Sequence, residues 1–310
     1  MKDQLITLFG GGGFVGRYVA QALLAAGARV RVAQRIPRDA WFLKPLGGLG
    51  QTQFVAADVT RPATVARAIE GADGVVNLVG SFADMAAVNA GGARIVAEAA
   101  AAKGVGALVH ISALGADPES LSTYGRTKGE GEKAVLAAFP GATILRPSLV
   151  FGREDQFTNR FAGMIAGAPV LPVLRGRTRF QPVYVHDVAE AVAKALAAPE
   201  AHAGRTYELG GPDVLTMTEL YRWLGRTIGR EPPMVDLPDS LGSLIAAFGF
   251  LPGAPITMDQ WRMLQRDNVV NAGAEGLGAL GIDPTPLASV APAWLVRFRR
   301  HGRFAKRLPA

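Results

Sequence analysis

The sequence predicts an α/β protein, in which a Rossmann-type doubly wound parallel sheet is followed by a smaller C-terminal α/β lobe. Three observations support this fold class. A glycine cluster at residues 10–13 separates a strand-like from a helix-like segment. Strand-like and helix-like segments then alternate up to Pro147, as in parallel βα units. Beyond that point the alternation weakens, and the 310 residues exceed the roughly 100 to 200 of a single domain.

The first βαβ unit occupies the N-terminal thirty-five residues. An apolar segment, Leu5–Phe9, leads into the glycines, and an alanine- and leucine-rich helical pattern follows over Val15–Ala26. A second strand-like segment, Arg29–Ala33, completes a unit of about thirty residues. This context distinguishes a nucleotide-binding turn from a glycine run that is merely flexible.

The glycines fit two spacings. Gly10, Gly13 and Gly16 match GxxGxxG, whereas Gly11, Gly13 and Gly16 match GxGxxG. In both cases the absent side chains let backbone N–H groups and the helix N-terminus approach a pyrophosphate. The turn is therefore predicted to bind a dinucleotide.

Further βα units follow the first one along the chain. Strands are predicted at Thr52–Ala56, Gly74–Val79, Ala107–Ser112 and Ala142–Arg146, and helices at Thr64–Glu70, Asn89–Lys103 and Tyr124–Phe139. Because ligands of such sheets bind at the carboxyl ends of the strands, chemistry is expected just after each strand.

The chain is predicted to divide into three parts: an NAD(P)-binding domain over residues 1–150, a second lobe over 151–290 that returns in part to the sheet, and a basic tail over 291–310. In the lobe, strands are expected at Val183–Val185 and Thr206–Leu209, and helices at Asp187–Ala198 and Thr216–Gly229. Thr216 and Glu219 have the spacing of a capping box.

Composition excludes several classes of protein and site. Hydrophobic residues make up 49% and charged residues 19%, unlike a disordered chain. The absence of cysteine excludes disulfides, thiolate nucleophiles and cysteine-based metal sites. His110, His186, His202 and His301 show no metal-ligand spacing, so no metal is predicted. The N-terminus has no apolar signal region, so no secretory signal is expected.

The net charge of +7 comes mainly from the C-terminal tail, where Arg297, Arg299, Arg300, Arg303, Lys306 and Arg307 supply six charges. A helix over Ala291–Arg307 would place Trp294, Leu295, Phe298 and Ala305 on one face and four arginines on the other. This pattern predicts contact with a membrane surface, through anionic lipid, or with an acidic partner, the alternative being a solvated tail. With little charge elsewhere, no nucleic acid partner is expected.

An uncharged run between Asp239 and Asp259 is long enough to raise the question of a membrane span. Glycines and prolines interrupt it repeatedly, so a single spanning helix is not predicted. A buried or interfacial helical hairpin is the alternative.

The end of the second strand predicts the cofactor. NAD enzymes usually place an acid there for the ribose 2′-hydroxyl, but this chain has Gln34 and Arg35, with Arg38 close by. A guanidinium complements a 2′-phosphate, and Arg17 is a candidate second contact. NADP(H) is therefore favoured over NAD(H), unless these arginines are only solvated loop charges.

Other cofactor contacts are predicted at the strand ends. Asp58 is placed either to accept from an adenine amino group or to cap the next helix. Gly80, in the segment NLVG, suits a close approach of the ribose. The predicted cofactor-binding residues are Gly10, Gly12, Gly13, Phe14, Val15, Gly16, Arg17, Arg35, Asp58, Val59, Leu78, Val79, Gly80, Ile111, Tyr124, Lys128, Pro147 and Val150.

Tyr124 and Lys128 are the candidate catalytic pair, with Ser112 as the third candidate. Four residues apart, the pair shares one helix face, and an ammonium beside a phenol favours the phenolate. Tyr124 is thereby expected to act as an acid or base near neutral pH, with Lys128 also reaching the nicotinamide ribose. Ser112 is followed by alanine rather than a second hydroxyl residue, and Ser122 or Thr123 are candidate substitutes.

In this order, the glycine turn, Asp58, NLVG, Ser112 and YxxxK resemble the short-chain dehydrogenase/reductase superfamily. The segments LRPSLVFG and RFQPVYVHDVAEAV resemble its extended and atypical branch, which includes nucleotide-sugar epimerases and dehydratases. More narrowly, FGGGGFVGRYV, HISALGA and FGREDQFTNRFA resemble the NAD(P)-binding accessory subunits of respiratory complex I. That resemblance implies a tightly held NADPH, a structural or assembly role, peripheral-arm subunits as partners, and a peripheral location on the matrix side or the cytoplasmic side of a bacterial inner membrane.

Two other functions stay open at this point. An NADP-dependent reductase or nucleotide-sugar epimerase/dehydratase would work through Tyr124. A substrate diphosphate would then need basic residues from the second lobe, for which Arg153, Arg160, Arg175, Arg177 and Arg179 are candidates. A redox sensor that reads NADPH is the third hypothesis. The sequence leaves open whether the chain turns over a substrate.

Overall fold

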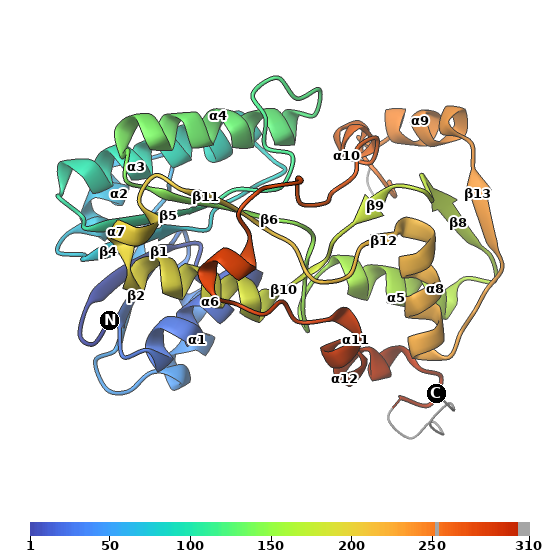
Figure 1. The fold of residues 1–310 in the computed structure, drawn as a ribbon, viewed down its shortest axis with the longest axis horizontal. Helices are drawn as coiled ribbons and strands as arrows, with labels where there is room; N and C mark the ends of the chain where they lie inside the picture. Colours follow the sequence, from blue (N-terminus) through green and yellow to red (C-terminus); the bar gives the residue numbers. More distant parts are fainter. Residues whose placement is uncertain (252–253, 303–310) are drawn as a thin grey trace. The chain divides into compact units, whose positions relative to one another are not determined.

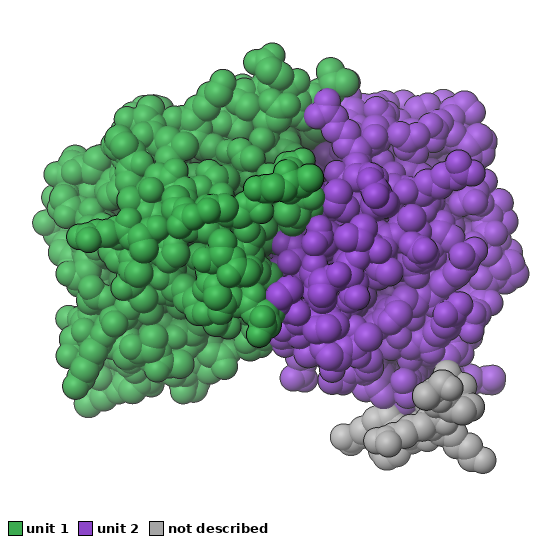
Figure 2. Space-filling model, in the orientation of Figure 1, with its two compact units in different colours: residues 1–147, 185–209, 270–283 green, residues 148–184, 210–269, 284–310 purple. Residues whose placement is uncertain are grey.

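The chain builds two units and passes repeatedly from one to the other in the computed structural model, which describes residues 1–251 and 254–302 (Figure 2). Unit 1 comprises Met1–Pro147, Val185–Leu209 and Val270–Asp283. Unit 2 comprises Ser148–Tyr184, Gly210–Val269 and Pro284–Ala310. Unit 1 therefore takes two later segments of the chain into its fold.

A seven-stranded sheet in the order β11-β6-β5-β4-β1-β2-β3 lies at the centre of unit 1. Its strands are β1 (Leu5–Phe9), β2 (Arg29–Gln34), β3 (Thr52–Ala56), β4 (Gly74–Asn77), β5 (Ala107–Ile111), β6 (Thr143–Pro147) and β11 (Thr206–Leu209). Every neighbouring pair is parallel. The predicted Rossmann-type sheet is confirmed.

Helices cover both faces of this sheet (Figure 1). On one face, α1 (Phe14–Ala25) packs against α6 (Val185–Ala197). On the other, α2 (Pro62–Ile69), α3 (Ala93–Ala102) and α4 (Thr123–Ala138) lie in a row. A π-helical turn, η2 (Ala86–Gly92), runs directly into α3, so the predicted helix Asn89–Lys103 starts earlier and changes its winding.

The main core of unit 1 lies under the α2, α3 and α4 face. Phe9, Leu108 and Ile144 reach it from the sheet, and Val96 and Val135 from the helices; all five are buried. At Gly131 of α4, an added Cβ would lie only 2.5 Å from the Asn89 carbonyl oxygen. Because glycine removes that atom, α4 can pack closely against η2, as the carboxyl edge of the sheet requires.

The β2 to β3 connection contains an element that the sequence did not predict, a 3₁₀ helix η1 over Pro37–Leu46. It begins with proline at its first position and holds a second proline inside, Pro45. Only Ala40 and Leu43 of this helix are buried. Unit 1 also contains two short elements, α7 (Pro199–His202) and η3 (Leu277–Leu280).

Unit 2 consists of short strand pairs and helices around its own core. Its strands are β7 (Val150–Phe151), β8 (Leu171–Leu174), β9 (Arg179–Phe180), β10 (Val183–Tyr184), β12 (Leu215–Thr216) and β13 (Met234–Leu237), paired as β10-β7, β12-β9 and β13-β8. The helices α5 (Phe157–Gly167) and α8 (Met217–Ile228) pack together. The predicted capping box at Thr216 and Glu219 is present at the start of α8.

The uncharged run forms α9 (Asp239–Ala247), which ends long before it could cross a bilayer. It packs against α10 (Met258–Met263) through Ala246 and Trp261. In the described part of the chain no helix has the length and apolarity of a membrane span.

The predicted amphipathic helix of the tail is wrong over its described residues. The chain forms α11 (Leu287–Val290), α12 (Pro292–Leu295) and the 3₁₀ turn η4 (Val296–Phe298), and Arg299 is already extended. Leu295 is fully buried, and Trp294 and Phe298 pack against the same core. The apolar side chains Trp294, Leu295 and Phe298, predicted to contact a membrane, therefore stabilise unit 2. The remaining tail residues, 303–310, lie outside the described residues.

Candidate functional site

The turn between β1 and α1 brings backbone, rather than side chains, to the carboxyl edge of the sheet. Gly10 has a φ of 80°, which favours glycine. The Gly13 N–H donates to the Gly10 carbonyl at 3.0 Å, and a Cβ on Gly16 would lie 2.4 Å from that oxygen. No side chain caps α1 and its first turn holds no acid, so its dipole favours an anion here.

The end of β2 forms a pocket next to this turn. The pocket has a volume of about 520 Å³ and is lined by Gly12, Gly13, Gln34, Arg35, Ile36 and Asp39. Gln34 fixes its wall, because its Oε1 accepts from the Gly12 N–H at 3.0 Å and its Nε2 donates to the Ile36 carbonyl at 2.7 Å. The predicted basic residue, Arg35, is exposed at this wall.

Asp58 follows β3 and holds its own loop together. Its Oδ1 accepts from the Thr60 N–H at 2.9 Å and from the Thr60 hydroxyl at 2.7 Å, and these hydrogen bonds lower the pKa of the carboxyl group. The charge of Arg35 lowers this pKa further, which places Arg35 near Asp58. The N-cap of α2 is Arg61, so the alternative that Asp58 caps this helix is wrong.

The segment after β4 lies against the glycine turn. The Leu78 N–H donates to the Phe9 carbonyl at 3.0 Å, and a Cβ on Gly10 would lie 3.3 Å from Cγ2 of Val79. A Cβ on Gly80 would meet no atom within 4 Å. The structure thus brings this predicted segment and the turn together at one edge.

Lys128 is buried beneath the same edge. Its Nζ donates to the Ile111 carbonyl at 2.6 Å. Burial lowers the pKa of Lys128 to about 8, although the nearby Glu132 carboxylate acts in the opposite direction. The Lys128 side chain therefore becomes a neutral amine under mildly alkaline conditions.

Tyr124 lies one turn earlier on α4, and its ring stacks on Phe82 with 4.4 Å between ring centroids. Burial raises the pKa of Tyr124 to about 12. Burial therefore opposes the predicted phenolate near neutral pH. The tyrosine is a proton donor in this state.

Ser112 and His110 bring further polar groups to the end of β5. Ser112 is buried, and its Oγ makes no hydrogen bond to any residue that the structure describes. His110 shares a 3.2 Å hydrogen bond with the Asn77 amide, which makes its Nδ1 the acceptor because Asn77 Nδ2 donates. Burial and the Lys128 charge hold the pKa of His110 well below its usual range, so the imidazole is neutral.

The family model "NAD dependent epimerase/dehydratase family" matches residues 6–210, which include the glycine turn, Asp58, Ser112, Tyr124 and Lys128. The chain belongs to the NAD dependent epimerase/dehydratase family. The resemblance to the extended short-chain dehydrogenases is confirmed, and the nucleotide-binding Rossmann fold is that of this family.

Relatives of known sequence align with most of the chain. The mitochondrial NADH dehydrogenase (ubiquinone) 1 alpha subcomplex subunit 9 of Arabidopsis thaliana is 34% identical, over 96% of this chain and 78% of its own. The ceramide reductase of Caulobacter vibrioides is 32% identical, over 81% of this chain and 80% of its own. The solved NADPH-dependent quinone oxidoreductase of Escherichia coli has the same fold, with a TM-score of 0.75, 22% identity and coverage of 94% and 99%.

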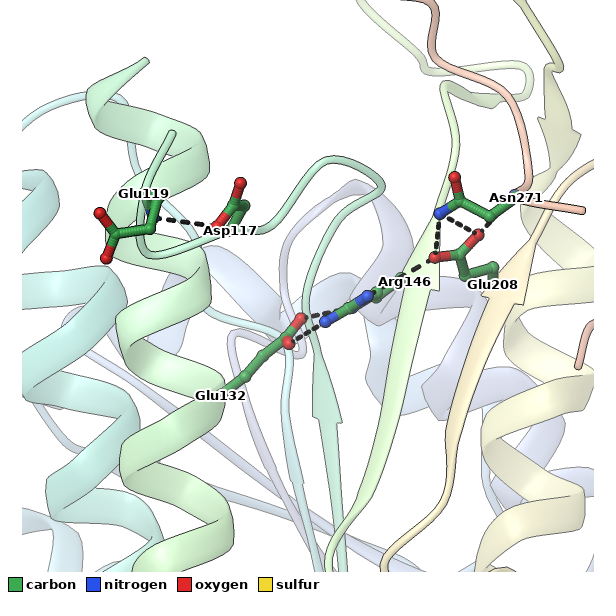
Figure 3. A network of polar contacts seen from close by, with 6 residues as sticks. All are labelled: Asp117, Glu119, Glu132, Arg146, Glu208 and Asn271. Carbon is green, nitrogen blue, oxygen red and sulfur yellow. Dashed lines mark hydrogen bonds and ion pairs between the residues drawn. The ribbon is translucent and has the colours of Figure 1, made fainter. Parts of the chain in front are cut away.

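Helix α4, which carries Tyr124 and Lys128, also takes part in an ion-pair network (Figure 3). Arg146 of β6 donates to both carboxylate oxygens of Glu132, at 2.9 and 2.6 Å, and lies 3.5 Å from Glu208 of β11. Glu208 accepts in turn from the Asn271 amide and backbone. The network joins α4, two strands and the returning segment, and so fixes the helix that carries Tyr124 and Lys128.

Sequence reasoning missed several contributors to this site. Gln34 and Asp39 line the pocket but were not among the predicted cofactor residues, and only their place after β2 signalled them. Glu132 follows Lys128 by four residues, a spacing that predicts a shared helix face. Its partner Arg146 carried no signal, because ion pairing between β6 and α4 requires the folded sheet.

The predicted residues Gly12 to Arg17 gather at the turn, and Arg17 stacks on Phe42 at 4.5 Å from the ring centroid. Val59 is buried in the core beside Asp58. Pro147 ends β6, where its carbonyl accepts from the Leu114 N–H at 3.0 Å. Val150 belongs to unit 2, in β7.

Three of the five predicted substrate arginines have partners inside unit 2. Arg175 pairs with Asp239, Arg179 pairs with Asp267 at 2.8 Å, and Arg160 donates to the Pro255 carbonyl at 2.9 Å. Arg153 and Arg177 are exposed. Because these three arginines are already paired within unit 2, they are less suited to bind a sugar diphosphate.

Proposed function

We propose that this chain is an NADP(H)-binding accessory subunit of respiratory NADH:ubiquinone oxidoreductase, complex I. The observation that carries the proposal is the similarity to the Arabidopsis subunit, at 34% identity over 96% of the chain. A second relative, the NADH-ubiquinone oxidoreductase 40 kDa subunit of Neurospora crassa, is 30% identical over 96%. The partners in this proposal are subunits of the peripheral arm. The location is peripheral, on the matrix side or the cytoplasmic side of a bacterial inner membrane.

NADP(H) is the proposed nucleotide, bound by the turn, by the ends of β3, β4 and β5, and by the Tyr124 and Lys128 pair. Arg35 at the pocket wall supports a 2′-phosphate, because a guanidinium gains a charge-assisted hydrogen bond there. Asp39 lines the same pocket and would repel that phosphate. The choice between NADP(H) and NAD(H) thus depends on which of the two side chains faces the ribose.

A mainly structural use of the nucleotide fits the state of the catalytic candidates. Tyr124 has a pKa of about 12 and an aromatic ring stacked on it, and Ser112 lacks a neighbouring hydroxyl residue. The general acid is therefore poorly matched to neutral pH. Binding without rapid turnover is the expected behaviour.

The test is native purification of the tagged chain from membranes of its source organism. Blue-native electrophoresis should find the chain in the band with NADH dehydrogenase activity, and acid extraction should release NADP(H) in about one-to-one ratio. A chain found only outside that band would exclude the accessory-subunit function. Extraction of NAD(H) instead would exclude the cofactor assignment alone.

An NADP-dependent reductase is the second candidate, favoured by the ceramide reductase relative and by the retained Tyr124 and Lys128. NADPH, when bound, supplies the hydride. Tyr124 would donate the proton, and Ser112, whose hydroxyl has no described partner, would orient the substrate oxygen. NADPH oxidation that depends on a keto-lipid and is abolished in Tyr124→Phe would favour this candidate, whereas the absence of such oxidation in the unmutated chain would exclude it.

A further inference from the structure

Exposed large apolar side chains gather in one short part of unit 1, the connection between β2 and β3. We name residues 36–49 the β2–β3 segment. Its exposed members are Ile36, Trp41, Phe42, Leu46 and Leu49, of which Trp41 is 52% exposed and Leu49 is completely exposed. Single exposed apolar residues are ordinary, but a concentration of them marks an interaction surface.

The charges around this segment are mostly basic. Arg35, Arg38 and Lys44 stand against one acid, Asp39. The Lys44 ammonium lies 4.0 Å from the Trp41 ring centroid, so it stays beside the apolar surface. An apolar patch with a basic rim complements a partner surface that is apolar at its centre and acidic around it.

The β2–β3 segment is also built onto the nucleotide pocket. Ile36 and Asp39 line that pocket, and the Ile36 carbonyl is held by the Gln34 amide. Phe42 stacks under Arg17, which follows the glycine turn. A Cβ on Gly12 would lie 3.0 Å from the Cβ of Ala40, so the turn and η1 are in close contact.

The β2–β3 segment has little regular secondary structure and few buried side chains. Its only helix is 3₁₀, with a proline inside and two buried side chains. Such helices have poor hydrogen-bond geometry, and segments with few buried contacts open most readily. Its contacts with the glycine turn and its place in the pocket wall are therefore what hold it in this form.

We propose that the β2–β3 segment is the face through which the chain docks on an acidic-rimmed apolar surface of a partner protein, and that the nucleotide in the adjoining pocket holds this face in its docking form. The proposal rests on the accessory-subunit function. It gives the bound nucleotide a structural task, because Ile36 and Asp39 of the β2–β3 segment also line the pocket.

The test compares surface variants in a strain that lacks the native gene. Trp41→Ser combined with Leu49→Ser should lower the amount of chain in the complex I band at least about tenfold, since central apolar anchors carry most interface energy. NADPH affinity should stay within about twofold, because neither side chain lines the pocket. Val170→Ser combined with Val214→Ser, two half-exposed valines of unit 2, is the matched control and should assemble normally.

Charge and nucleotide dependence supply independent readouts. Arg38→Glu combined with Lys44→Glu should weaken assembly, with the greatest loss at low salt. Adding NADPH to nucleotide-stripped chain should raise its recapture by membranes of the deletion strain about tenfold over NADPH-free samples, and the Trp41 and Leu49 variant should show no such increase.

The outcomes separate the two proposals. Normal assembly of the Trp41 and Leu49 variant, or recapture that ignores NADPH, overturns the docking face and leaves the accessory function standing. Binding to vesicles of phosphatidylcholine and phosphatidylglycerol that is lost in this variant while assembly persists assigns the face to lipid and also overturns it. Absence of the unmutated chain from the complex I band overturns both proposals.

Discussion

At the scale of single residues, two features shape the site: glycines, which have no side chain and so allow close packing, and burial, which shifts the pKa of ionisable side chains. Gly16 lets the turn approach α1, and Gly12 leaves room for the Gln34 amide. Burial moves the pKa of Lys128 down and the pKa of Tyr124 up. Both shifts favour uncharged side chains at the carboxyl end of β5, where a nicotinamide is expected.

Gly12→Ala tests the contact with Gln34. The new Cβ would lie 2.3 Å from Gln34 Oε1, so the free energy of unfolding should fall by about 1 to 3 kcal/mol, as in other overpacked sites. Gly80→Ala, with open space around its Cβ, is the control and should change stability by less than about 0.5 kcal/mol. Urea unfolding measures both. Combining Gly12→Ala with Gln34→Ala should recover stability; no recovery would contradict the contact.

Lys128 predicts a pH dependence of stability. Its pKa is about 8 in the folded chain, compared with 10.5 for the ordinary side chain. Between these values the unfolded chain binds a proton that the folded chain does not, so the free energy of unfolding rises with pH across this window. Measured from pH 8 to 10, the unmutated chain should gain stability relative to Lys128→Met. A constant difference between the two would show that Lys128 is not desolvated.

At the scale of elements, the same residue pattern serves different ends in different surroundings. The tail pattern of Trp294, Leu295 and Phe298 suits a membrane helix, but in unit 2 these side chains meet a core that already contains α5 and α8. Burial there removes their apolar surface from water, which stabilises unit 2. The Arg299 Nε–H then donates to the Thr227 carbonyl at 3.0 Å, which fixes the following turn to α8.

Leu295→Ala should therefore destabilise unit 2. Truncation of a fully buried leucine costs about 2 to 5 kcal/mol, through lost burial and the cavity left behind. Arg300→Ala, at an exposed position, should change stability by less than about 0.5 kcal/mol. Thermal unfolding followed by circular dichroism compares the two variants. Equal stability of Leu295→Ala and the unmutated chain would contradict the packing of the tail against the core of unit 2.

At the scale of the whole molecule, the chain passes back and forth between a nucleotide-binding unit and a second unit. Unit 1 recovers Val185–Leu209 and Val270–Asp283 after the chain has entered unit 2. The first returning segment supplies α6 and the edge strand β11, and the second supplies Asn271 to the Glu208 network. A nucleotide bound by unit 1 should therefore stabilise residues distant in sequence.

NADPH should raise the melting temperature of the chain more than NADH does. At a concentration one hundred times its Kd, a ligand adds about 2.7 kcal/mol to the free energy of unfolding. Arg35→Asp should remove most of the difference between the two nucleotides, because a charge-assisted hydrogen bond contributes about 1.5 to 3 kcal/mol. Asp39→Asn is the matched control and should leave the NADPH preference intact or raise it. Equal shifts with both nucleotides in the unmutated chain would contradict the NADP(H) preference.

The sequence alone determined the fold class, the order of the βα units and the position of the glycine turn. These follow from local signals: the period of apolar residues, the glycines that a tight turn requires and the capping residues of helices. The family position of Tyr124 and Lys128 was likewise evident, because their spacing on one helix depends only on helix geometry.

Only the tertiary structure decided how these residues behave. Nothing local to YxxxK reveals that Tyr124 stacks on Phe82, or that Lys128 is buried against Ile111, and these surroundings reverse the expected direction of the tyrosine pKa. The Gln34 to Gly12 hydrogen bond joins the end of β2 to the glycine turn, and the Arg146 network joins α4, β6, β11 and the segment that holds Asn271. The apolar side chains of the tail pack against a core built from segments that are distant in sequence. Burial and pairing are properties of the folded chain, and both energies depend on neighbours that the sequence does not place side by side.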